Sequence, residues 1–491
     1  MSSMIAFDGW KLVKVQILRE MKVYLKNRQW TNGLTLALCF GAFAPLQSQQ
    51  TWVVKPEWVR AHEDFLASDA LSGRGSATRD EQIAAEYVAS EFLSYGLKPA
   101  PGMSGLIQSA EVVAPELDGK AMLTAGDVML AEGADLRLLI PTGVSSSGPL
   151  LHLTAADVRQ AIIPKGAIVL LTELPPQGSA LRFAYSLRRS GAGVVLFVED
   201  DALRASLAKN PNPHPPLRLN QEPGDATTLP ATLAAVSEVA MQRLLAEKAG
   251  PPAVFTVHAL PTKLRKTFNA VGYLTGSDPN AGTILLSAHL DHLGVVSNAT
   301  NGDPIFNGAN DDAAGTTGVL ELAHALAAGP KLKRGILFVC YGSEEVGGLG
   351  SQFFGKHPPI QLTQIVANLE FEMIGAQDPK MPKDTLLLTG WERSNLGPIL
   401  RDHGAKLGPD PYPEQHFFER SDNYSLALEG VVAHTAAGWG TPPTYHQPND
   451  DLAHIDIDFM TTAIQSLIEP IRWLAESDFK PAWNPGGQPK R

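Results

Sequence analysis

The chain has 491 residues, of which 44% are hydrophobic and 19% charged, and its formal net charge is −11. This length exceeds that of one ordinary domain, and the composition is typical of a globular protein with a sizeable core. The acidic balance argues against nucleic acid as a partner, because binding to phosphates needs an excess of clustered Lys and Arg.

The first 48 residues have the pattern of a signal peptide. Lys and Arg outnumber Asp and Glu up to residue 28, an apolar stretch covers residues 34–44, and Pro45 and polar residues follow. The apolar stretch is shorter than the ~20 residues that a membrane-spanning helix needs. We therefore expect the leader to be removed and the protein to be exported, either periplasmic or secreted, with no stable membrane insertion afterwards. A membrane anchor is the alternative interpretation.

Two stretches with helical periodicity come next, over residues 58–71 and 78–95, and Thr78 can cap the second. From residue 112 to 260, short apolar runs alternate with Gly and Pro. The pattern there predicts strands over 166–171 and 193–200, and helices over 179–189 and 238–248. No cluster of His with acidic residues forms in this segment, which indicates a separate, non-catalytic α/β module.

From residue 269 onward the pattern becomes strand, loop and helix in repetition. It predicts strands over 283–290, 335–342 and 365–373, and helices over 315–328 and 458–476. The strand over 335–342 shows little alternation, so it is expected to be buried on both faces. This order is typical of an α/β domain with a mostly parallel sheet and helices on both sides, in which ligands bind at the carboxyl ends of the strands.

Acidic or imidazole side chains lie at these strand ends and in the loops beyond them. They are His289, Asp291 and His292; Asp311 and Asp312; Glu344 and Glu345; Glu370 and Glu372; and His446, Asp450 and Asp451. Gathered at one rim, bare carboxylates would repel one another and lose hydration, and a divalent metal offsets both costs. Mixed imidazole and carboxylate ligands suit zinc, while the absence of Cys leaves Mn or Co possible.

Two features of these loops suggest which residues would bind metal and which would act on the water. If one of the adjacent Glu344 and Glu345 binds metal, its neighbour can point at the activated water. Two metals roughly 3.5–4 Å apart would need a bridging carboxylate. Asp311 is placed for that role, because the glycines around it allow close approach of the backbone.

Five motifs in this order resemble a known family. "AHLDHLG", "NGANDDAAG", "SEEVGGLGS", "FEMIG" and "YHQPNDD" are similar to those of the co-catalytic di-zinc aminopeptidases of peptidase clan MH. Residues 65–100 resemble the amino-terminal part of the secreted bacterial members, and the middle segment resembles the protease-associated domain that many members carry as an insertion. The resemblance implies a mixed, mostly parallel sheet flanked by helices, with a smaller inserted α/β domain.

We expect the chain to divide into five parts. They are a signal peptide (1–48), the first part of the peptidase domain (49–115), the protease-associated-like insertion (116–257), the second part of the peptidase domain with the metal site (258–478) and a flexible tail (479–491).

The family motifs imply roles for single residues. Two zinc ions would be held by five of them: His289 and Glu372 on one ion, Glu345 and His446 on the other, and Asp311 on both. Three further residues would act beside the ions: Glu344 as general base, Asp291 by orienting the imidazole of His289, and Tyr445 by contacting the substrate.

Some residues have competing interpretations. His292 is expected in the loop as a supporting residue rather than a ligand. Glu370 could replace Glu372, since both point to the same strand face, and the family motif favours Glu372, although many members have Asp there. Asp312 is expected to support the Asp311 turn. Asn423 stands where His is common in the family, which leaves the role of its loop open.

The resulting prediction is a metallo-aminopeptidase, a hydrolase that removes residues from peptides with a free amino terminus. Carboxypeptidase or dipeptidase action on the same site is one alternative. Glutaminyl cyclisation and a non-catalytic, receptor-like binding protein are others. The complete ligand set argues against these last two.

Overall fold

The computed structural model describes residues 52–490, apart from 115, 155, 158–160, 173–186, 188–190, 202, 205–216, 221–230, 248–251, 261–262 and 297–301. The expected signal peptide lies outside the described residues, as does almost all of the helix predicted over 179–189. No helix in the described part of the chain is both long enough and apolar enough to cross a membrane.

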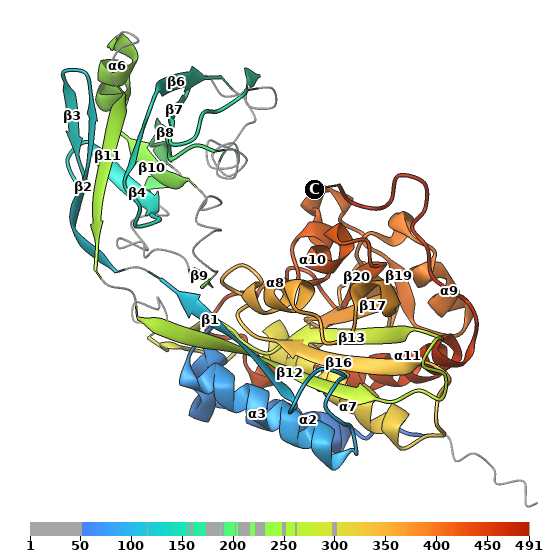
Figure 1. Cartoon of the computed structure of the whole chain (residues 1–491). Coiled ribbons are helices and arrows are strands. Elements are labelled where there is room, and N and C mark those ends of the chain that lie inside the picture. Colours follow the sequence, from blue (N-terminus) through green and yellow to red (C-terminus); the bar gives the residue numbers. More distant parts are fainter. Residues whose placement is uncertain are drawn as a thin grey trace, which may run out of the picture. The chain divides into compact units, whose positions relative to one another are not determined.

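A nine-stranded sheet forms the main body (Figure 1), in the order β19-β18-β20-β17-β13-β16-β12-β1-β9. Its four central strands are parallel: β20 (Ala433–Ala437), β17 (Ile365–Glu372), β13 (Thr283–His289) and β16 (Gly335–Tyr341). Antiparallel pairs lie toward both edges, through β12 (Leu264–Leu274), β1 (Ile107–Val113), β9 (Arg218–Leu219) and β18 (Leu386–Leu388), and β19 (Leu407–Pro409) runs parallel to β18. The predicted mixed sheet is confirmed.

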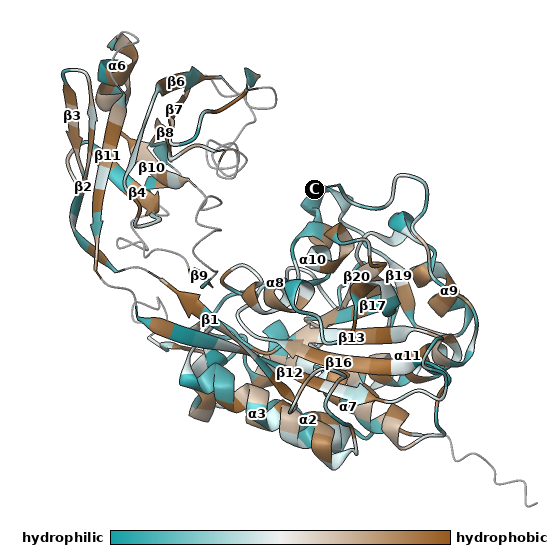
Figure 2. Cartoon of the chain, viewed as in Figure 1, coloured by the Kyte–Doolittle hydropathy of each residue, from teal (hydrophilic) through white to brown (hydrophobic). Residues whose placement is uncertain are grey.

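Helices cover both faces of this sheet (Figure 1). One set packs together, comprising α2 (Pro56–Leu66), α3 (Arg79–Ser94), α7 (Gly315–Ala327) and α11 (Ile457–Glu476). On the other face lie α8 (Leu349–Lys356) and α10 (Asn423–Leu428), and α9 (Leu396–Asp402) precedes β19. Every residue of β13 and β16 is buried, which explains why neither strand alternates in hydropathy (Figure 2).

The first two helices keep close to the predicted ranges. Thr78 caps α3 by accepting hydrogen bonds from the backbone N–H groups of Asp80 and Glu81, as expected. The first predicted helix is shorter than expected, because a 3₁₀ segment, Asp69–Arg74, follows α2. Ser72 and Gly73 within it have positive φ, which an α-helix does not allow.

Two smaller sheets form within residues 117–259. One contains β3 (Val128–Ala131), β2 (Leu117–Ala125), β11 (Ala253–Ala259) and β5 (Ser146–Gly148). The other contains β4 (Leu136–Ile140), β10 (Thr232–Val236), β8 (Val194–Val198), β7 (Ile168–Leu171) and β6 (Leu150–Leu153), and α6 (Glu238–Ala246) follows β10. The ends of this segment meet, since the N–H of Leu260 donates to the carbonyl of Glu116 at 2.8 Å.

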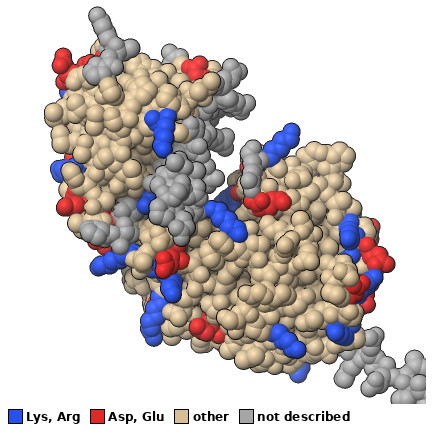
Figure 3. All heavy atoms as spheres, in the orientation of Figure 1, with Lys and Arg blue, Asp and Glu red and all other residues tan. Residues whose placement is uncertain are grey.

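The last residues of the described chain are held against the main body. The N–H of Ala482 donates to Asn395 Oδ1 at 2.8 Å, and the indole N–H of Trp483 donates to the carbonyl of Gly430 at 3.1 Å. These contacts run against the expectation of a flexible tail over residues 479–491. On the face seen in Figure 3, the Lys and Arg side chains of the described residues are scattered among acidic and uncharged ones.

Candidate metal centre

The candidate site lies where the central strands end. His289 is the last residue of β13 and Glu372 the last of β17, while Glu344 and Glu345 follow β16 closely. Asp311 lies in a six-residue turn, Ala309–Ala314, that leads into α7. Because parallel strands end at the same edge of a sheet, segments far apart in the sequence bring these side chains together, as the sequence predicts.

The first donor group comprises His289, Asp311 and Glu372. Their nitrogen and oxygen donor atoms lie within 4.8 Å of one another. Nε2 of His289 is 3.2 Å from Oδ1 of Asp311, and both side chains are buried. These are the residues expected on the first ion and its bridge.

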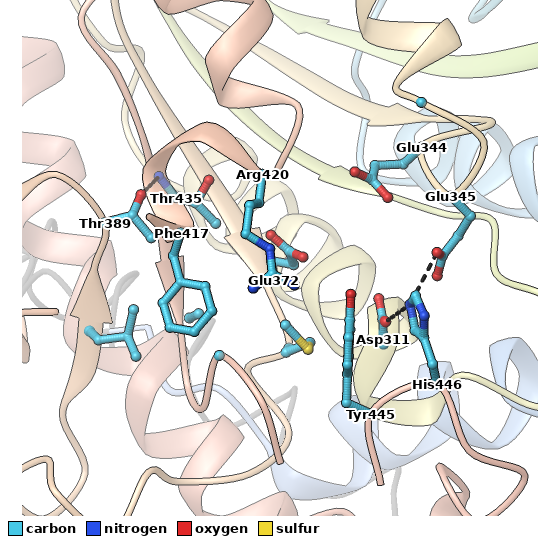
Figure 4. Close-up of a pocket in the computed structure, with 15 residues that line it drawn as sticks. Asp311, Glu344, Glu345, Glu372, Thr389, Phe417, Arg420, Thr435, Tyr445 and His446 are labelled. Carbon is cyan, nitrogen blue, oxygen red and sulfur yellow. Dashed lines mark hydrogen bonds and ion pairs between the residues drawn. The ribbon is translucent and has the colours of Figure 1, made fainter. Parts of the chain in front are cut away.

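A second donor group surrounds the other oxygen of Asp311 (Figure 4). Nε2 of His446 is 3.2 Å from Asp311 Oδ2 and 3.1 Å from Glu345 Oε2. Asp311 therefore presents one oxygen to each group, which is the arrangement that a bridging carboxylate requires.

A short two-stranded sheet, β14 (Gly294–Val295) with β15 (Ile305–Phe306), lies in the loop between His289 and Asp311.

His292 joins this second group. Its Nδ1 is 2.8 Å from Glu345 Oε1 and 3.9 Å from Asp311 Oδ2, and all three donors lie within 4.8 Å of one another. The sequence predicted a supporting role for His292. Its position three residues after His289 is the feature that could have indicated a place nearer the donors.

The chemistry of these groups fits divalent metal. Donors bound to one zinc ion by bonds of about 2.0–2.2 Å lie roughly 3–3.5 Å apart, close to the separations here. Burial raises the pKa of Glu372 to about 7, which shows how poorly the site tolerates an uncompensated carboxylate. Burial acts in the same direction on Asp311, but hydrogen bonds from His289 and His446 outweigh it and hold the pKa of that carboxyl below its usual range.

Glu344 is the carboxylate that neither donor group uses. It lines the pocket beside the two groups, and burial raises its pKa well above the ordinary value. Asp291 fixes its position, because the Asp291 carboxylate accepts hydrogen bonds from the N–H groups of Glu344 at 2.9 Å and Glu345 at 3.4 Å. The hydroxyl of Ser76 also donates to this carboxylate, at 2.6 Å.

The contact expected between Asp291 and His289 takes a different form from that predicted. His289 Nδ1 is 3.7 Å from the Asp291 carboxylate and 3.2 Å from the Asp291 main-chain oxygen. Both atoms face the same ring nitrogen, and the carboxylate is used mainly by the amides that follow β16. The role of Asp291 in orienting His289 therefore stays a prediction.

The alternatives to the expected ligands have partners of their own. The Glu370 carboxylate accepts hydrogen bonds from the hydroxyls of Ser421 and Thr435 and from the N–H of Asn423. Asp312 accepts from the N–H groups of Gly315 and Met373 at 2.9 Å each, as expected of a residue that supports the turn. The side-chain amide of Asn423 is directed to main-chain carbonyls.

Arg74 was missed by the sequence reasoning. Its buried guanidinium donates to the carbonyls of Leu290, Asn307 and Gly308, at 2.6–2.8 Å, and also to that of Leu66. The first three carbonyls belong to the loops that carry His289 and Asp311. These three partners lie more than 200 residues away in the sequence, so only the short "GRGS" loop indicated a special role.

A pocket of about 250 Å³ opens beside the donor groups. It is lined by Glu344 and by four of the donors, Asp311, Glu345, Glu372 and His446, and its apolar lining comprises Met373, Leu387, Phe417, Ala437 and Gly440. Arg420 and Tyr445 also line it (Figure 4). The Tyr445 ring stacks on His446, with 3.9 Å between the ring centroids.

A family model matches the part of the chain that holds this site. Residues 269–469 match the model of peptidase family M28. Aminopeptidase YwaD of Bacillus subtilis is 26% identical over 206 residues, which are 40% of this chain and 45% of that protein. The chain thus spans less than half the length of this curated relative.

Two solved structures share the fold. An aminopeptidase from Aneurinibacillus sp. strain AM-1 covers 90% of this chain and 99% of its own, at 20% identity and a TM-score of 0.53. BSAP, a zinc aminopeptidase from Bacillus subtilis, covers 89% of this chain and 98% of its own, at 16% identity and a TM-score of 0.50. Residues 269–469, the part of the chain that matches peptidase family M28, supply every donor described above.

Proposed function

We propose that this protein is a zinc-dependent aminopeptidase that removes amino-terminal residues from peptides. The observation that carries the proposal is the position of Asp311, which presents one oxygen to each of two donor groups beside a glutamate that neither group uses. The match of this segment to peptidase family M28 and the aminopeptidases among the relatives support it.

Two zinc ions would be held by the residues that the sequence indicates: His289, Glu372 and Asp311 on one side, and Glu345, His446 and Asp311 on the other. Mn or Co could also be accepted by these oxygen and nitrogen donors. When bound, such a pair polarises a peptide carbonyl and lowers the pKa of water.

Glu344 would move the proton during hydrolysis. One carboxylate oxygen takes a proton from the attacking water, and the same group then delivers it to the nitrogen of the leaving peptide. The raised pKa of Glu344 favours this role, because a carboxylate with an ordinary pKa is a weak base at neutral pH. Burial also raises the pKa of Tyr445, so its hydroxyl stays protonated and can donate a hydrogen bond to the substrate carbonyl.

Two bound divalent ions would offset the negative charge of Asp311, Glu344, Glu345 and Glu372, which all line the pocket. An ion with an open position could then hold the neutral amine of a substrate beside the carbonyl to be attacked. The apolar lining of the pocket gives the side chain of the first residue a surface to bury. Peptides with a free amino terminus are therefore the proposed substrates.

A second candidate is action at the carboxyl end or on dipeptides, and Arg420 is the observation that favours it. Its guanidinium lines the same pocket and would form a paired hydrogen bond with a substrate carboxylate. The aminopeptidase activity named for the sequence relative makes this the weaker candidate.

Two further expectations complete the proposal. Export through a signal peptide at residues 1–48 would place the enzyme in the periplasm or outside the cell. Residues 116–257 would be an inserted protease-associated-like domain, which the two small sheets of this segment support.

The experiment that tests the proposal measures hydrolysis of aminoacyl anilides before and after chelation. We expect activity to be lost with the metal and restored by two equivalents of zinc per chain. His446→Ala should lose metal, whereas His454→Ala, an exposed histidine paired with Asp451, should keep it. Full activity after metal removal, confirmed by elemental analysis, would overturn the proposal.

A further inference from the structure

His292 is a buried imidazole to which none of the roles above gives a partner. Its side chain is fully buried, and both ring nitrogens lie inside the protein without a hydrogen bond. Burying a polar atom without a partner costs stability, so an unpartnered imidazole beside carboxylates indicates a missing ligand.

The ring nitrogen of His292 faces the second donor group. Nδ1 lies 2.8 Å from Glu345 Oε1, and the His292 and His446 rings meet edge to face at 5.7 Å between centroids. Three side chains thus converge around Oδ2 of Asp311: His292, Glu345 and His446.

The orientation of His292 and Glu345 distinguishes a hydrogen bond between the two side chains from binding to a shared ion. Although Nδ1 of His292 and Oε1 of Glu345 are at hydrogen-bond distance, the two atoms are not aligned for a hydrogen bond, and each is left without one. Two ligands of one ion aim their lone pairs at the ion rather than at each other. Their separation is then set by the two metal bonds, at about 3 Å.

We propose that His292 is a sixth protein ligand of the metal centre, on the ion shared by Glu345 and His446. This inference rests on the proposed function, because it presumes that the centre holds metal. It gives the two sides of Asp311 different donor sets, with two imidazoles on the Glu345 side and one on the Glu372 side. Since imidazole suits zinc better than Mn²⁺, the Glu345 side should be the more selective for zinc.

The surroundings hold the ring in place without using its nitrogens. The main-chain N–H of His292 donates to the carbonyl of Arg74 at 3.1 Å. The ring packs against Gly308, where a Cβ atom would lie 2.4 Å from Cγ of His292. The imidazole is therefore positioned by its backbone and by packing, which leaves Nδ1 free to bind an ion.

X-ray absorption on the full chain loaded with zinc tests the proposal directly. We expect three imidazoles shared by two zinc ions in the wild type and two in His292→Ala. In zinc titrations of the stripped protein, His292→Ala should weaken one of the two binding steps by at least ~10²-fold, beyond the effect of losing an outer partner. His292→Asn, which keeps a polar group near the Nδ1 position, should not restore that step.

Two results would overturn the assignment. A wild-type protein with two zinc ions but only two imidazoles would leave the proposed function intact and remove His292 from the ligands. Restoration of zinc affinity by His292→Asn would show that His292 orients Glu345 instead. A wild-type protein that binds no zinc would refute the proposed function itself.

A matched control separates ligand loss from loss of core packing. His434 is another fully buried imidazole, with its ring nitrogens paired to Ser394 and Thr389. His434→Asn should leave the zinc count and both binding steps unchanged. If His292→Ala does not fold, the imidazole count of the wild-type protein still decides.

Discussion

Glu344 and Glu345 are neighbours in the sequence with different surroundings in the structure. Glu345 contacts His292 and His446, whereas Glu344 lines the pocket outside both donor groups. We expect Glu344→Gln to keep its metal content and to lose at least ~10²-fold in kcat, the lower range for loss of a general base. Elemental analysis and steady-state kinetics on the same preparation measure both quantities.

Glu345→Gln is the matched variant for this comparison. It should lower metal occupancy, because an amide is a poorer ligand than a carboxylate. Normal metal content in Glu345→Gln together with metal loss in Glu344→Gln would show that the two roles are exchanged.

Glu63 is a buried acid outside the two donor groups, and it makes stability depend on pH. Burial raises its pKa from 4.5 to about 8, so the folded state favours the neutral form. The stability contributed by this group is complete below pH 4.5 and is lost as pH rises toward 8. Glu63→Gln, which stays neutral, should therefore be more stable than the wild type at pH 9, by up to about 5 kcal/mol.

Chemical denaturation at pH 5 and pH 9 measures this difference. The gain should shrink or vanish at pH 5, where wild-type Glu63 is already neutral. Glu57→Gln, on the exposed side of the same helix, should change the unfolding free energy little at either pH. A gain for Glu63→Gln that is equal at both pH values would refute the titration of Glu63 as its cause.

The loops of the metal centre depend on an element that precedes them by more than 200 residues. Arg74, at the end of the 3₁₀ segment, holds the loops before His292 and Asp311 through their carbonyl groups. Lys cannot reproduce this fork of donors. We expect Arg74→Lys to weaken zinc binding by roughly 10–100-fold, as loss of an outer partner does.

Competition with a chromophoric chelator measures that affinity. Arg60→Lys is the control, since Arg60 forms an exposed ion pair with Asp64 on α2 and surface pairs contribute little. An unchanged zinc affinity in a folded Arg74→Lys protein would show that the loops keep their geometry without the guanidinium.

Elements with strong local patterns were predictable from the sequence. The strand that became β16 is a continuous apolar run, and acid or imidazole at or just after the ends of β13, β16 and β17 pointed to the centre that the structure assembles. The contacts of Arg74 and the direction of the His292 ring depend on segments distant in the sequence, and periodicity carries no information about them. The contacts of Ala482 and Trp483 were missed for the same reason.

At the scale of the whole molecule, the described part of residues 117–259 forms two sheets of its own, adds β9 to the main sheet and supplies none of the metal donors. Because Leu260 and Glu116 are hydrogen-bonded neighbours, a short Gly-rich linker can replace the residues between them. We expect this shortened chain to bind zinc as the full chain does, measured by elemental analysis after its fold is confirmed by circular dichroism.

The deletion also removes β9, whose Leu219 belongs to a hydrophobic cluster against which Val346, in the loop after Glu345, also packs. Leu219→Ala in the full chain tests this cluster alone and should leave zinc content unchanged. Loss of zinc from a folded, shortened chain would show that residues 117–259 help to build the centre.

The central claim is that the centre acts on the amino end of a peptide, and one comparison tests it most directly. Hydrolysis of leucyl-anilide is measured beside that of acetyl-leucyl-anilide, with the zinc-loaded protein. The free amine should react faster by orders of magnitude, because proper placement of a substrate group is worth several kcal/mol of barrier and the acetylated terminus cannot take that place. Equal rates on the two substrates would contradict the account and would favour action at another part of the peptide.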